Sequence, residues 1–209
     1  MAGTAGATLS RRDRKVAATR QSIVDAALSL IAEHGFTATT IEQITERADV
    51  GQRTFFRYFP TKESVVYADI EQKWNRAVAV LDDRPIDEPP FLSLRAALDE
   101  LARLAADDVD SIRLRMRLAD EHPALADYHR QLFAVRLGDR FASFVAERLG
   151  VDQTTDPRPG MWTALAMASF RIGFEQWVAN DLVGDLHRFV DDALAAAGDA
   201  IRTTHAGTT

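Results

Sequence analysis

The chain has 209 residues, of which 46% are hydrophobic and 27% charged, so it can bury a core and is not disordered as a whole. It contains no cysteine, which excludes disulfide frameworks and thiolate metal sites and is typical of the reducing cytoplasm. No apolar run approaches the ~18 residues of a membrane span, and we expect no signal peptide, because small, polar and then basic residues follow Met1.

The net charge is −6, but the charges are unevenly distributed along the chain. Residues 1–62 contain nine Lys or Arg and six Asp or Glu, whereas residues 63–209 contain sixteen and twenty-five. Only the module that faces nucleic acid has to be basic, and an acidic remainder helps to keep the other face off the DNA. The distribution therefore favours a nucleic-acid-binding N-terminal part, although the net charge alone argues against one.

The first predicted helix runs from about Val16 to His34, with apolar residues at helical spacing and Gly35 as its C-cap. Met1 to Ser10 is expected to be disordered. A basic cluster lies between the two segments and has two interpretations. It is either the solvated start of the helix or an arm that reaches phosphates or the minor groove of DNA. The cluster consists of Arg11, Arg12, Arg14 and Lys15.

Residues 39–62 contain two short helix signals separated by a tight turn. Thr40 opens a capping box for the first helix, and Gly51 supplies the backbone freedom that the turn requires. The second helix, residues 52–58, ends before Pro60. A helix, a glycine turn and a second helix form a helix-turn-helix, whose second helix enters the major groove of DNA. The apolar residues expected to close a core with the first helix are Ile41, Ile44, Ala48, Val50, Phe55 and Phe59.

The pattern stays helical after this stretch, and the whole chain is predicted to be all-α with about nine helices. One long helix from Thr61 to about Leu81 leaves the first module and enters the next domain. Residues 82–90 contain three prolines and no helical period, which predicts a linker. We therefore expect a helix-turn-helix domain over residues 11–62 and a second helical domain over residues 63–203. The helices expected after the linker span about residues 91–107, 112–118, 124–149, 161–180 and 185–203.

Residues 112–118, with the sequence IRLRMRL, alternate between apolar and basic side chains. Strict alternation is typical of a strand. However, Leu, Arg and Met are good helix formers, no partner strand is predicted nearby, and every neighbouring segment is helical. The segment is therefore predicted to be a helix.

The last two predicted helices carry small residues that permit close approach of another helix. A helix-turn-helix regulator usually needs two copies, about one turn of DNA or ~34 Å apart. We therefore expect a homodimer held by a four-helix bundle of these two helices from each partner; packing within one chain is the alternative. The small residues are Ala164, Ala168, Gly173, Ala196 and Gly198.

Four segments resemble the signature of the tetracycline-repressor (TetR) family. The segments are residues 36–41 (FTATTI), 48–51 (ADVG), 54–59 (TFFRYF) and 62–63 (KE). The resemblance covers roughly residues 18–66 and is specific there. It implies a homodimeric all-α regulator with an N-terminal helix-turn-helix and a divergent C-terminal ligand domain.

By position, the resemblance implies a set of DNA-contacting residues on and around the second helix of the motif. Gln52 can pair with adenine and Arg53 with guanine, so these two are expected to read sequence. Thr54 and Lys62 are expected to meet phosphates, which position the protein without reading bases. The complete set is Thr40, Gln52, Arg53, Thr54, Phe56, Tyr58 and Lys62.

The chain departs from the family signature at two of its positions. Gly51 stands where a Ser or Thr usually caps the second helix, so no side-chain acceptor is present there. Phe56 replaces the usual tyrosine and cannot hydrogen-bond a phosphate; contact with a sugar or a thymine methyl is the alternative.

The C-terminal part also resembles regulators with an acyl-CoA-like ligand domain, of the mycofactocin-system type. Residues 113–118 and 121–125 and Trp177 carry this resemblance. The aromatic residues of the helix expected over 161–180 form either an ordinary core or the wall of a ligand pocket. The nearby arginines are either surface ion pairs or clamps for an anionic ligand. The candidate pocket residues are Arg113, Arg117, Trp162, Phe170, Arg171, Phe174 and Trp177.

The sequence thus predicts a cytoplasmic transcriptional regulator, usually a repressor in this family, that binds a palindromic double-stranded DNA operator as a homodimer. A small hydrophobic or acyl-CoA-like effector would release it. The alternative is a helical DNA-binding protein whose C-terminal domain only dimerises. An enzyme joined to a helix-turn-helix is a third interpretation, but no nucleophile–base pair and no metal-ligand spacing supports it, and no cofactor is expected.

Overall fold

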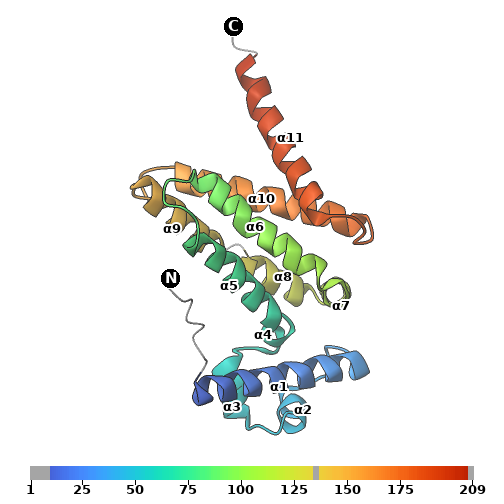
Figure 1. The fold of residues 1–209 in the computed structure, drawn as a ribbon. Helices are drawn as coiled ribbons and strands as arrows, with labels where there is room; N and C mark the ends of the chain where they lie inside the picture. Colours follow the sequence, from blue (N-terminus) through green and yellow to red (C-terminus); the bar gives the residue numbers. More distant parts are fainter. Residues whose placement is uncertain (1–9, 134–136, 207–209) are drawn as a thin grey trace, which may run out of the picture. The chain divides into compact units, whose positions relative to one another are not determined.

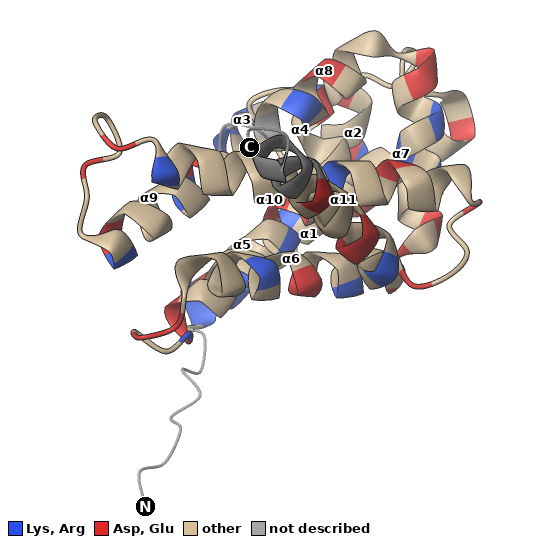
Figure 2. Ribbon diagram, turned by 90° about the horizontal axis from the view of Figure 1, so that it is seen from above, with Lys and Arg blue, Asp and Glu red and all other residues tan. Residues whose placement is uncertain are grey.

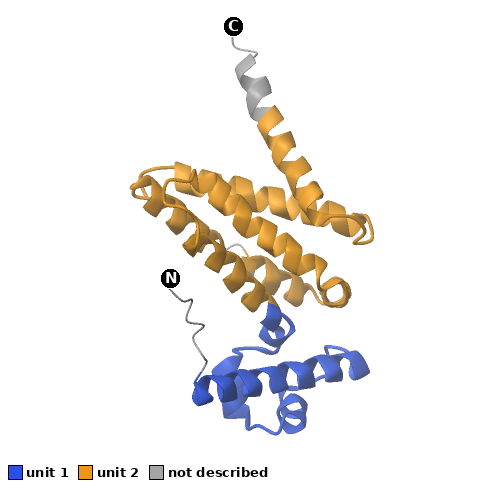
Figure 3. Cartoon of the chain, viewed as in Figure 1, with its two compact units in different colours: residues 1–69 blue, residues 70–209 orange. Residues whose placement is uncertain are grey.

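The computed structural model describes residues 10–133 and 137–206, so the predicted disorder of the first nine residues lies outside it. The described part of the chain contains helices and turns but no strand, which confirms the all-α prediction. The chain divides into two compact units, one up to Asp69 and one from Ile70 onward (Figure 3). The sequence had suggested a domain boundary after Lys62.

The first unit contains four complete helices (Figure 1). They are α1 (Arg11–His34), α2 (Ile41–Arg47), α3 (Gln52–Tyr58) and α4 (Lys62–Val66). The core forms where one face of α1 meets α2 and α3, and Ile23, Ile44 and Phe55 are fully buried in it. All six residues predicted to close this core belong to it; four are buried, and Ile41 and Val50 are half-buried at its edge.

Local capping explains where the first helices begin and end. The Thr40 hydroxyl accepts a hydrogen bond from the Gln43 N–H, and the Gln43 side chain accepts one from the Thr40 N–H, as the capping box predicts. Gly35 ends α1 with a φ of 81°, a left-handed value that favours glycine. Ser10 and Asp13 form another capping box, which starts α1 at Arg11. The basic cluster is therefore the solvated first turn of a helix rather than a separate arm.

The long helix predicted from Thr61 to Leu81 is wrong in one respect, because it is interrupted at Tyr67. Thr61 caps α4 as expected, but α4 ends at Val66, and a new helix, α5 (Ala68–Asp82), follows. Tyr67 has a φ of −105° and a ψ of 15° and is buried. Two consecutive valines before it are stiff β-branched residues with reduced helix propensity, which favours an end to the helix there.

The second unit contains most of α5 and six further helices in the described residues (Figure 1). They are α6 (Pro90–Ala106), α7 (Val109–Glu121), α8 (Pro123–Leu132), α9 (Gly138–Leu149), α10 (Arg158–Ala179) and α11 (Leu186–Ala206). The alternating segment 112–118 lies inside α7, which confirms that it is helical. The single helix predicted over residues 124–149 corresponds to α8 and α9. Phe133 and Leu137 between them are π-helical, and the part of the prediction over residues 134–136 lies outside the described residues. Gly138, a residue of low helix propensity, begins α9.

The segment expected as a linker, residues 82–90, is held by polar contacts. Arg84 forms an ion pair with Glu88, and Ser93 Oγ donates to the same carboxylate at 2.7 Å. Arg148 of α9 donates to the carbonyl oxygens of Arg84 (2.8 Å) and Pro85. The segment thus connects α5 to α6 as a fixed turn, because its own side chains and α9 bind its backbone.

Helices α10 and α11 pack closely at one glycine. A Cβ atom at Gly173 would lie 2.6 Å from the backbone nitrogen of Val190, so only glycine allows α11 to approach α10 this closely. Gly173 was predicted to serve the interface between partners. Its position instead serves the packing of α10 against α11 within one chain.

Acidic and basic side chains are mixed along the helices of the second unit (Figure 2). Several pairs lie one helical turn apart, such as Arg103 with Glu100 (2.7 Å) and Arg171 with Glu175 (2.7 Å). Arg95 of α6 pairs with Asp191 of α11 at 2.7 Å. The negative balance of this unit is therefore distributed rather than collected at one site. Within the described residues, no helix has the length and apolar character needed to cross a membrane.

Candidate nucleic-acid interface and ligand-binding region

Helix α3 has one buried and one exposed side. Phe55 is fully buried, and Phe59 directly after the helix is 2% exposed. Gln52 and Arg53 occupy the first turn and are exposed, as the sequence predicts for residues that read bases. The buried phenylalanines fix the rotation of the helix about its axis, so these two polar side chains point away from the core.

Of three other predicted contact residues, Thr40 caps α2, and Thr54 and Phe56 lie on α3. Thr40 is exposed, and because its oxygen accepts the capping hydrogen bond, its own hydroxyl proton is left to donate. Thr54 is half-buried. Phe56 is 52% exposed and meets Phe55 edge to face with ring centres 5.5 Å apart. An exposed aromatic ring held by a buried one can contact a sugar or a thymine methyl, which is the alternative that the sequence left open.

Tyr58 and Arg57 form a pair at the last turn of α3. The Tyr58 ring packs against the core of the first unit, and the Arg57 guanidinium lies 4.8 Å from the centre of that ring. Arg57 Nη2 also donates to the Tyr58 hydroxyl at 3.1 Å. Tyr58 was predicted as a DNA contact, whereas Arg57 was not. The sequence did contain a signal for Arg57, because it lies four residues after Arg53 on the same short helix.

Lys62, predicted to meet a phosphate, has its ammonium group engaged within the first unit. Its Nζ donates to the carbonyl oxygens of Phe36 (2.7 Å) and Thr39 (2.8 Å), and it lies 4.1 Å from the centre of the Phe36 ring. Burial lowers the pKa of the Lys62 ammonium below its ordinary value. Two of its three N–H groups thus bind the turn between α1 and α2.

The basic cluster at the start of α1 is exposed to solvent. Arg11, Arg12, Arg14 and Lys15 all project from the first turn and a half of the helix. Asp13 lies among them and is engaged in the capping box with Ser10. The cluster therefore presents positive charge without an ordered arm among the described residues.

The predicted aromatic wall belongs to a row of stacked rings inside the second unit. Phe174 lies between Trp177 (5.9 Å between ring centres) and Phe170 (6.3 Å), and Phe170 stacks on Phe133 at 6.2 Å. The row continues to Trp74 of α5, 5.7 Å from Phe133. The structure thus brings three predicted residues together with the rings of Trp74 in α5 and of Phe133 directly after α8, which the sequence did not connect with them.

Trp177 and its neighbours are packed rather than arranged around an open space. Trp177 is 1% exposed, and its indole N–H donates to the Gly184 carbonyl at 3.1 Å. Phe170 is 8% exposed, while Trp162 is half-buried at the other end of α10. Around Trp177 the ordinary core interpretation therefore describes the observed packing.

The predicted arginines do not converge on the aromatic row. Arg171 is exposed and pairs with Glu175 on its own helix. Arg113 donates to the Asp181 carbonyl at 3.0 Å, and with Arg117 it lines an open hollow of about 630 Å³ between α7 and the end of α10. Three carboxylates line the same hollow, so its charge does not favour an anion. They belong to Asp110, Asp120 and Asp181.

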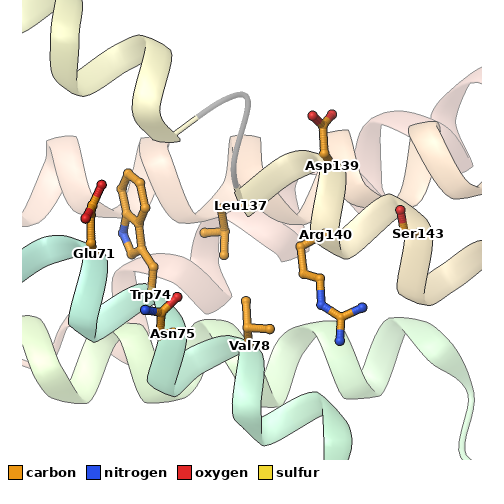
Figure 4. Close-up of a pocket in the computed structure, with 8 residues that line it drawn as sticks. All are labelled: Glu71, Trp74, Asn75, Val78, Leu137, Asp139, Arg140 and Ser143. Carbon is orange, nitrogen blue, oxygen red and sulfur yellow. The ribbon is translucent and has the colours of Figure 1, made fainter. Parts of the chain in front are cut away.

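A second hollow, of about 580 Å³, lies between α5 and the start of α9 (Figure 4). Its apolar residues are Trp74 and Val78 of α5 and Leu137 before α9. Polar and charged side chains complete the lining. They are Glu71, Asn75, Asp139, Arg140 and Ser143. Its volume lies in the range of small-molecule sites, about 300–1,000 Å³.

A charged cluster that the sequence did not predict lies near the aromatic row. Arg115 is 9% exposed, and its guanidinium lies 3.6 Å from the Asp108 carboxylate, which also binds Lys73. Burial alone would raise the pKa of Asp108, but hydrogen bonds from Lys73 and Ser111 and the charge of Arg115 lower it overall. The signal in the sequence was Arg115, the central arginine of the alternating segment, which lies two residues after Arg113 and was not chosen as a candidate.

His129 lies in the same region as this cluster. Its ring stacks beside Phe133, with centres 6.5 Å apart, and near Trp74 at 6.4 Å. Burial and the positive charges of Arg115 and Arg130 lower the pKa of His129 from 6.5 to about 4. No group of three or more His, Asp or Glu side chains among the described residues is arranged to hold a metal ion.

Two protein-family models match the chain. Residues 23–68 match the model for bacterial regulatory proteins of the tetR family, and residues 88–201 match the MftR C-terminal domain. The first match contains α2 and α3, and the second contains almost all of α6 to α11.

Individual proteins are similar over longer stretches. The HTH-type transcriptional regulator TcmR of Streptomyces glaucescens is 34% identical over 79% of this chain and 76% of its own. The mycofactocin biosynthesis transcriptional regulator MftR of Mycobacterium tuberculosis is 33% identical over 92% of this chain and 93% of its own. The crystal structure of Thermus thermophilus FadR, a TetR family repressor in complex with lauroyl-CoA, has the same fold, with a TM-score of 0.51. It is 24% identical and covers 84% of this chain and 91% of its own.

Proposed function

The chain belongs to the TetR family of bacterial regulatory proteins, with a C-terminal domain of the MftR type, and from this we propose a repressor that binds a palindromic operator as a homodimer. As a family member, it is a DNA-binding transcriptional regulator and not an enzyme. A small hydrophobic or acyl-CoA-like effector would bind the second unit and release the operator. The protein would act in the cytoplasm, where its DNA target lies.

The exposed face of α3 is the observation that carries the DNA-binding part of the proposal. Buried Phe55 holds the helix so that Gln52 and Arg53 project from its first turn. We assign base reading to these two residues, adenine to Gln52 and guanine to Arg53, because their side chains can pair bidentately with those bases. Thr40, Thr54 and Tyr58 would contact phosphates, and Phe56 would make apolar contact.

Replacing Arg53 tests this docking. Selection from randomised duplexes would first identify the operator, and binding isotherms would then compare every base at each position. Arg53→Ala should relax the preference at one position in each half-site and cost about 1–3 kcal/mol there, because a bidentate guanine contact is lost. Arg76→Ala removes an exposed arginine from α5 in the second unit and should change nothing. An unchanged base preference in Arg53→Ala would show that α3 does not read this operator as proposed.

The hollow between α5 and α9 is our candidate for the effector site. Its volume suits a small molecule, and Trp74, Val78 and Leu137 offer apolar contact. Helix α5 begins at Ala68 in the first unit and continues through the second, so a ligand that shifts α5 acts on the chain that leads to the DNA-binding helices. A coupling of about 1–3 kcal/mol would change operator affinity about 5- to 150-fold.

Filling this hollow tests the effector site. A thermal-shift panel of acyl-CoA thioesters, beginning with lauroyl-CoA, and of aromatic compounds would identify ligands that also release the operator. Val78→Trp should abolish the response to those ligands and leave operator affinity unchanged, because the added ring occupies the hollow. Ala79→Trp, at an exposed position on the same helix, is the matched control and should respond normally.

A dimerisation domain without an effector remains the second candidate, and the packed surroundings of Trp177 favour it. It predicts that no compound in the panel stabilises the protein or releases the operator. A response that survives in Val78→Trp would instead place the effector at another site.

A further inference from the structure

The ammonium group of Lys62 is used inside the first unit. It donates to the carbonyl oxygens of Phe36 and Thr39, at 2.7 and 2.8 Å, and lies over the Phe36 ring. An ammonium group has three N–H donors, and the two carbonyls take two of them. Burial makes the charge costly unless such acceptors compensate it. The geometry is that of a cation that stabilises a turn.

The turn that Lys62 binds leads directly into α2. Phe36 is buried, and Thr39 is fully buried and donates its hydroxyl to the Gly35 carbonyl at 2.8 Å. The next residue, Thr40, is the N-cap of α2 and a proposed phosphate contact. A shift of the turn would therefore move the Thr40 hydroxyl and the start of α2 together.

Arg57 has the opposite character. It is exposed, and one of its five N–H donors is directed to the Tyr58 hydroxyl at 3.1 Å. The Tyr58 ring rests on the core and also holds the guanidinium by a cation–π contact at 4.8 Å. A guanidinium held in this way has lost part of its side-chain entropy before any ligand binds, which lowers the cost of an additional contact.

The Tyr58 hydroxyl is arranged to act with Arg57. Its oxygen accepts the hydrogen bond from Arg57, so its own proton is left to donate to another acceptor. A phosphate oxygen beside the pair could therefore receive N–H groups of the guanidinium and the O–H of the phenol. Arginine is well suited to such a contact, because its planar donors match phosphate geometry.

We propose that Arg57, together with the Tyr58 hydroxyl, carries the phosphate-binding charge at the end of the recognition helix, and that Lys62 is a positioning residue that holds the turn before α2. The inference rests on the proposed docking of α3 on DNA. It reverses the roles that the spacing of the motif suggests, because there Lys62 is the phosphate contact and Arg57 has no role.

The salt dependence of DNA binding distinguishes a phosphate contact from a positioning residue. Each phosphate neutralised by a cation steepens the slope of log K against log[salt] by about 0.9 on duplex DNA. Arg57→Gln should therefore flatten the slope on nonspecific duplex by about 0.9 for each bound protomer. Lys62→Met should weaken binding at every salt concentration and leave the slope unchanged. Arg76→Gln, in the second unit, should alter neither affinity nor slope.

Two further variants test how Lys62 acts. Lys62→Gln keeps N–H donors for the two carbonyls without the charge, so it should recover part of the affinity lost in Lys62→Met; it also decides the question if Lys62→Met does not fold. Thr40→Ala should be non-additive with Lys62→Met, because the lysine acts on DNA through the turn that carries Thr40.

A slope flattened by about 0.9 in the Lys62 variants, or an unchanged slope in Arg57→Gln, would overturn the proposal. Equal losses in Lys62→Met and Lys62→Gln, or additive effects of Lys62→Met and Thr40→Ala, would also contradict it. If α3 does not dock on DNA as proposed, the base preference of Arg53→Ala will be unchanged. That outcome is measured independently of the salt slopes, so the two failures can be told apart.

Discussion

Asp49, not Gly51, adopts the left-handed backbone conformation in the turn between α2 and α3. Its φ is 53°, whereas Gly51 has a φ of −77° and a ψ of 153°, extended values that any residue can adopt. Asp is one of the few residues besides glycine that tolerate the left-handed region, since its short side chain can bond locally. Two backbone hydrogen bonds, Asp49 N–H to Glu46 O and Val50 N–H to Thr45 O, close the turn. The glycine is therefore the uncapped start of α3 rather than the pivot of the turn.

His129 makes the stability of the second unit depend on pH. Its folded pKa is about 4, below the 6.5 of an exposed histidine, so the unfolded chain binds a proton more readily. The stability that the neutral His129 ring contributes is fully present above pH 6.5 and is lost as the pH falls toward 4. Hydrogen bonds from Arg47 and Arg84 lower the pKa values of Glu33 and Glu88, respectively, to about 2. The stability that these two ionised carboxylates contribute is lost only as the pH falls below 4.5, so it does not change between pH 7 and pH 5.

We expect His129→Phe to remove most of the stability loss between pH 7 and pH 5. The wild type should lose roughly 2 kcal/mol over this interval, because one proton is taken up on unfolding across about 1.5 pH units below 6.5. Phenylalanine keeps a ring beside Trp74 and Phe133 but cannot be protonated. Urea unfolding at the two pH values measures the difference, and a parallel loss in both proteins would assign the pH dependence to other groups.

At the scale of elements, close packing decides which helices can be neighbours. The face of α10 that contains Gly173 lies directly on the backbone of Phe189 and Val190 in α11. Trp177 reinforces this pairing one turn later, since its indole binds the Gly184 carbonyl in the turn before α11. The close packing of α10 on α11 therefore depends on the absence of a side chain at Gly173.

Gly173→Ala should destabilise the second unit by about 1–3 kcal/mol, because the added methyl group would overlap the α11 backbone, which cannot yield as a flexible side chain can. Gly160→Ala, near the start of the same helix, has open space around its Cβ position and should be neutral or slightly stabilising. Thermal unfolding of both variants measures the contrast. Equal melting temperatures would mean that α11 moves aside without cost.

At the scale of the whole molecule, one exposed face of α10 supports the proposed homodimer. Met161 is 65% exposed and Ile172 is 38% exposed, and Leu165 and Ala168 lie between them at spacings of three and four residues. Such a stripe is typical of a helix that packs against another helix. With Gly173 engaged by α11 of its own chain, this stripe is the better candidate for the contact between partners.

Ile172→Arg should convert a dimer into a monomer at micromolar concentration, because a charge would be buried in the apolar contact between two copies. Leu92→Arg is the matched control, since Leu92 is an exposed apolar residue (49%) on α6, outside the stripe. Light scattering gives the mass of each variant. A monomeric wild-type protein would refute the dimer, and a dimeric Ile172→Arg protein would move the interface elsewhere.

Local signals in the sequence determined the helical architecture of both units. The capping box at Thr40, the C-cap at Gly35 and the apolar period of α10 each depend on residues a few positions apart, so they are readable along the chain. The same holds for the exposure of Arg53, because its position two residues before Phe55 places it on the other side of the helix. One break was missed, at Tyr67, because helix-forming residues on both sides conceal it.

Only the tertiary structure decided the features that join distant residues. Lys62 binds carbonyls 23 and 26 residues away, and nothing in its neighbours reveals that its charge is used inside the fold. The aromatic row and the hollow beside Trp74 combine side chains from separate helices. The physical reason is that helix periodicity specifies which side is buried, whereas the partner on that side depends on how the helices pack in space.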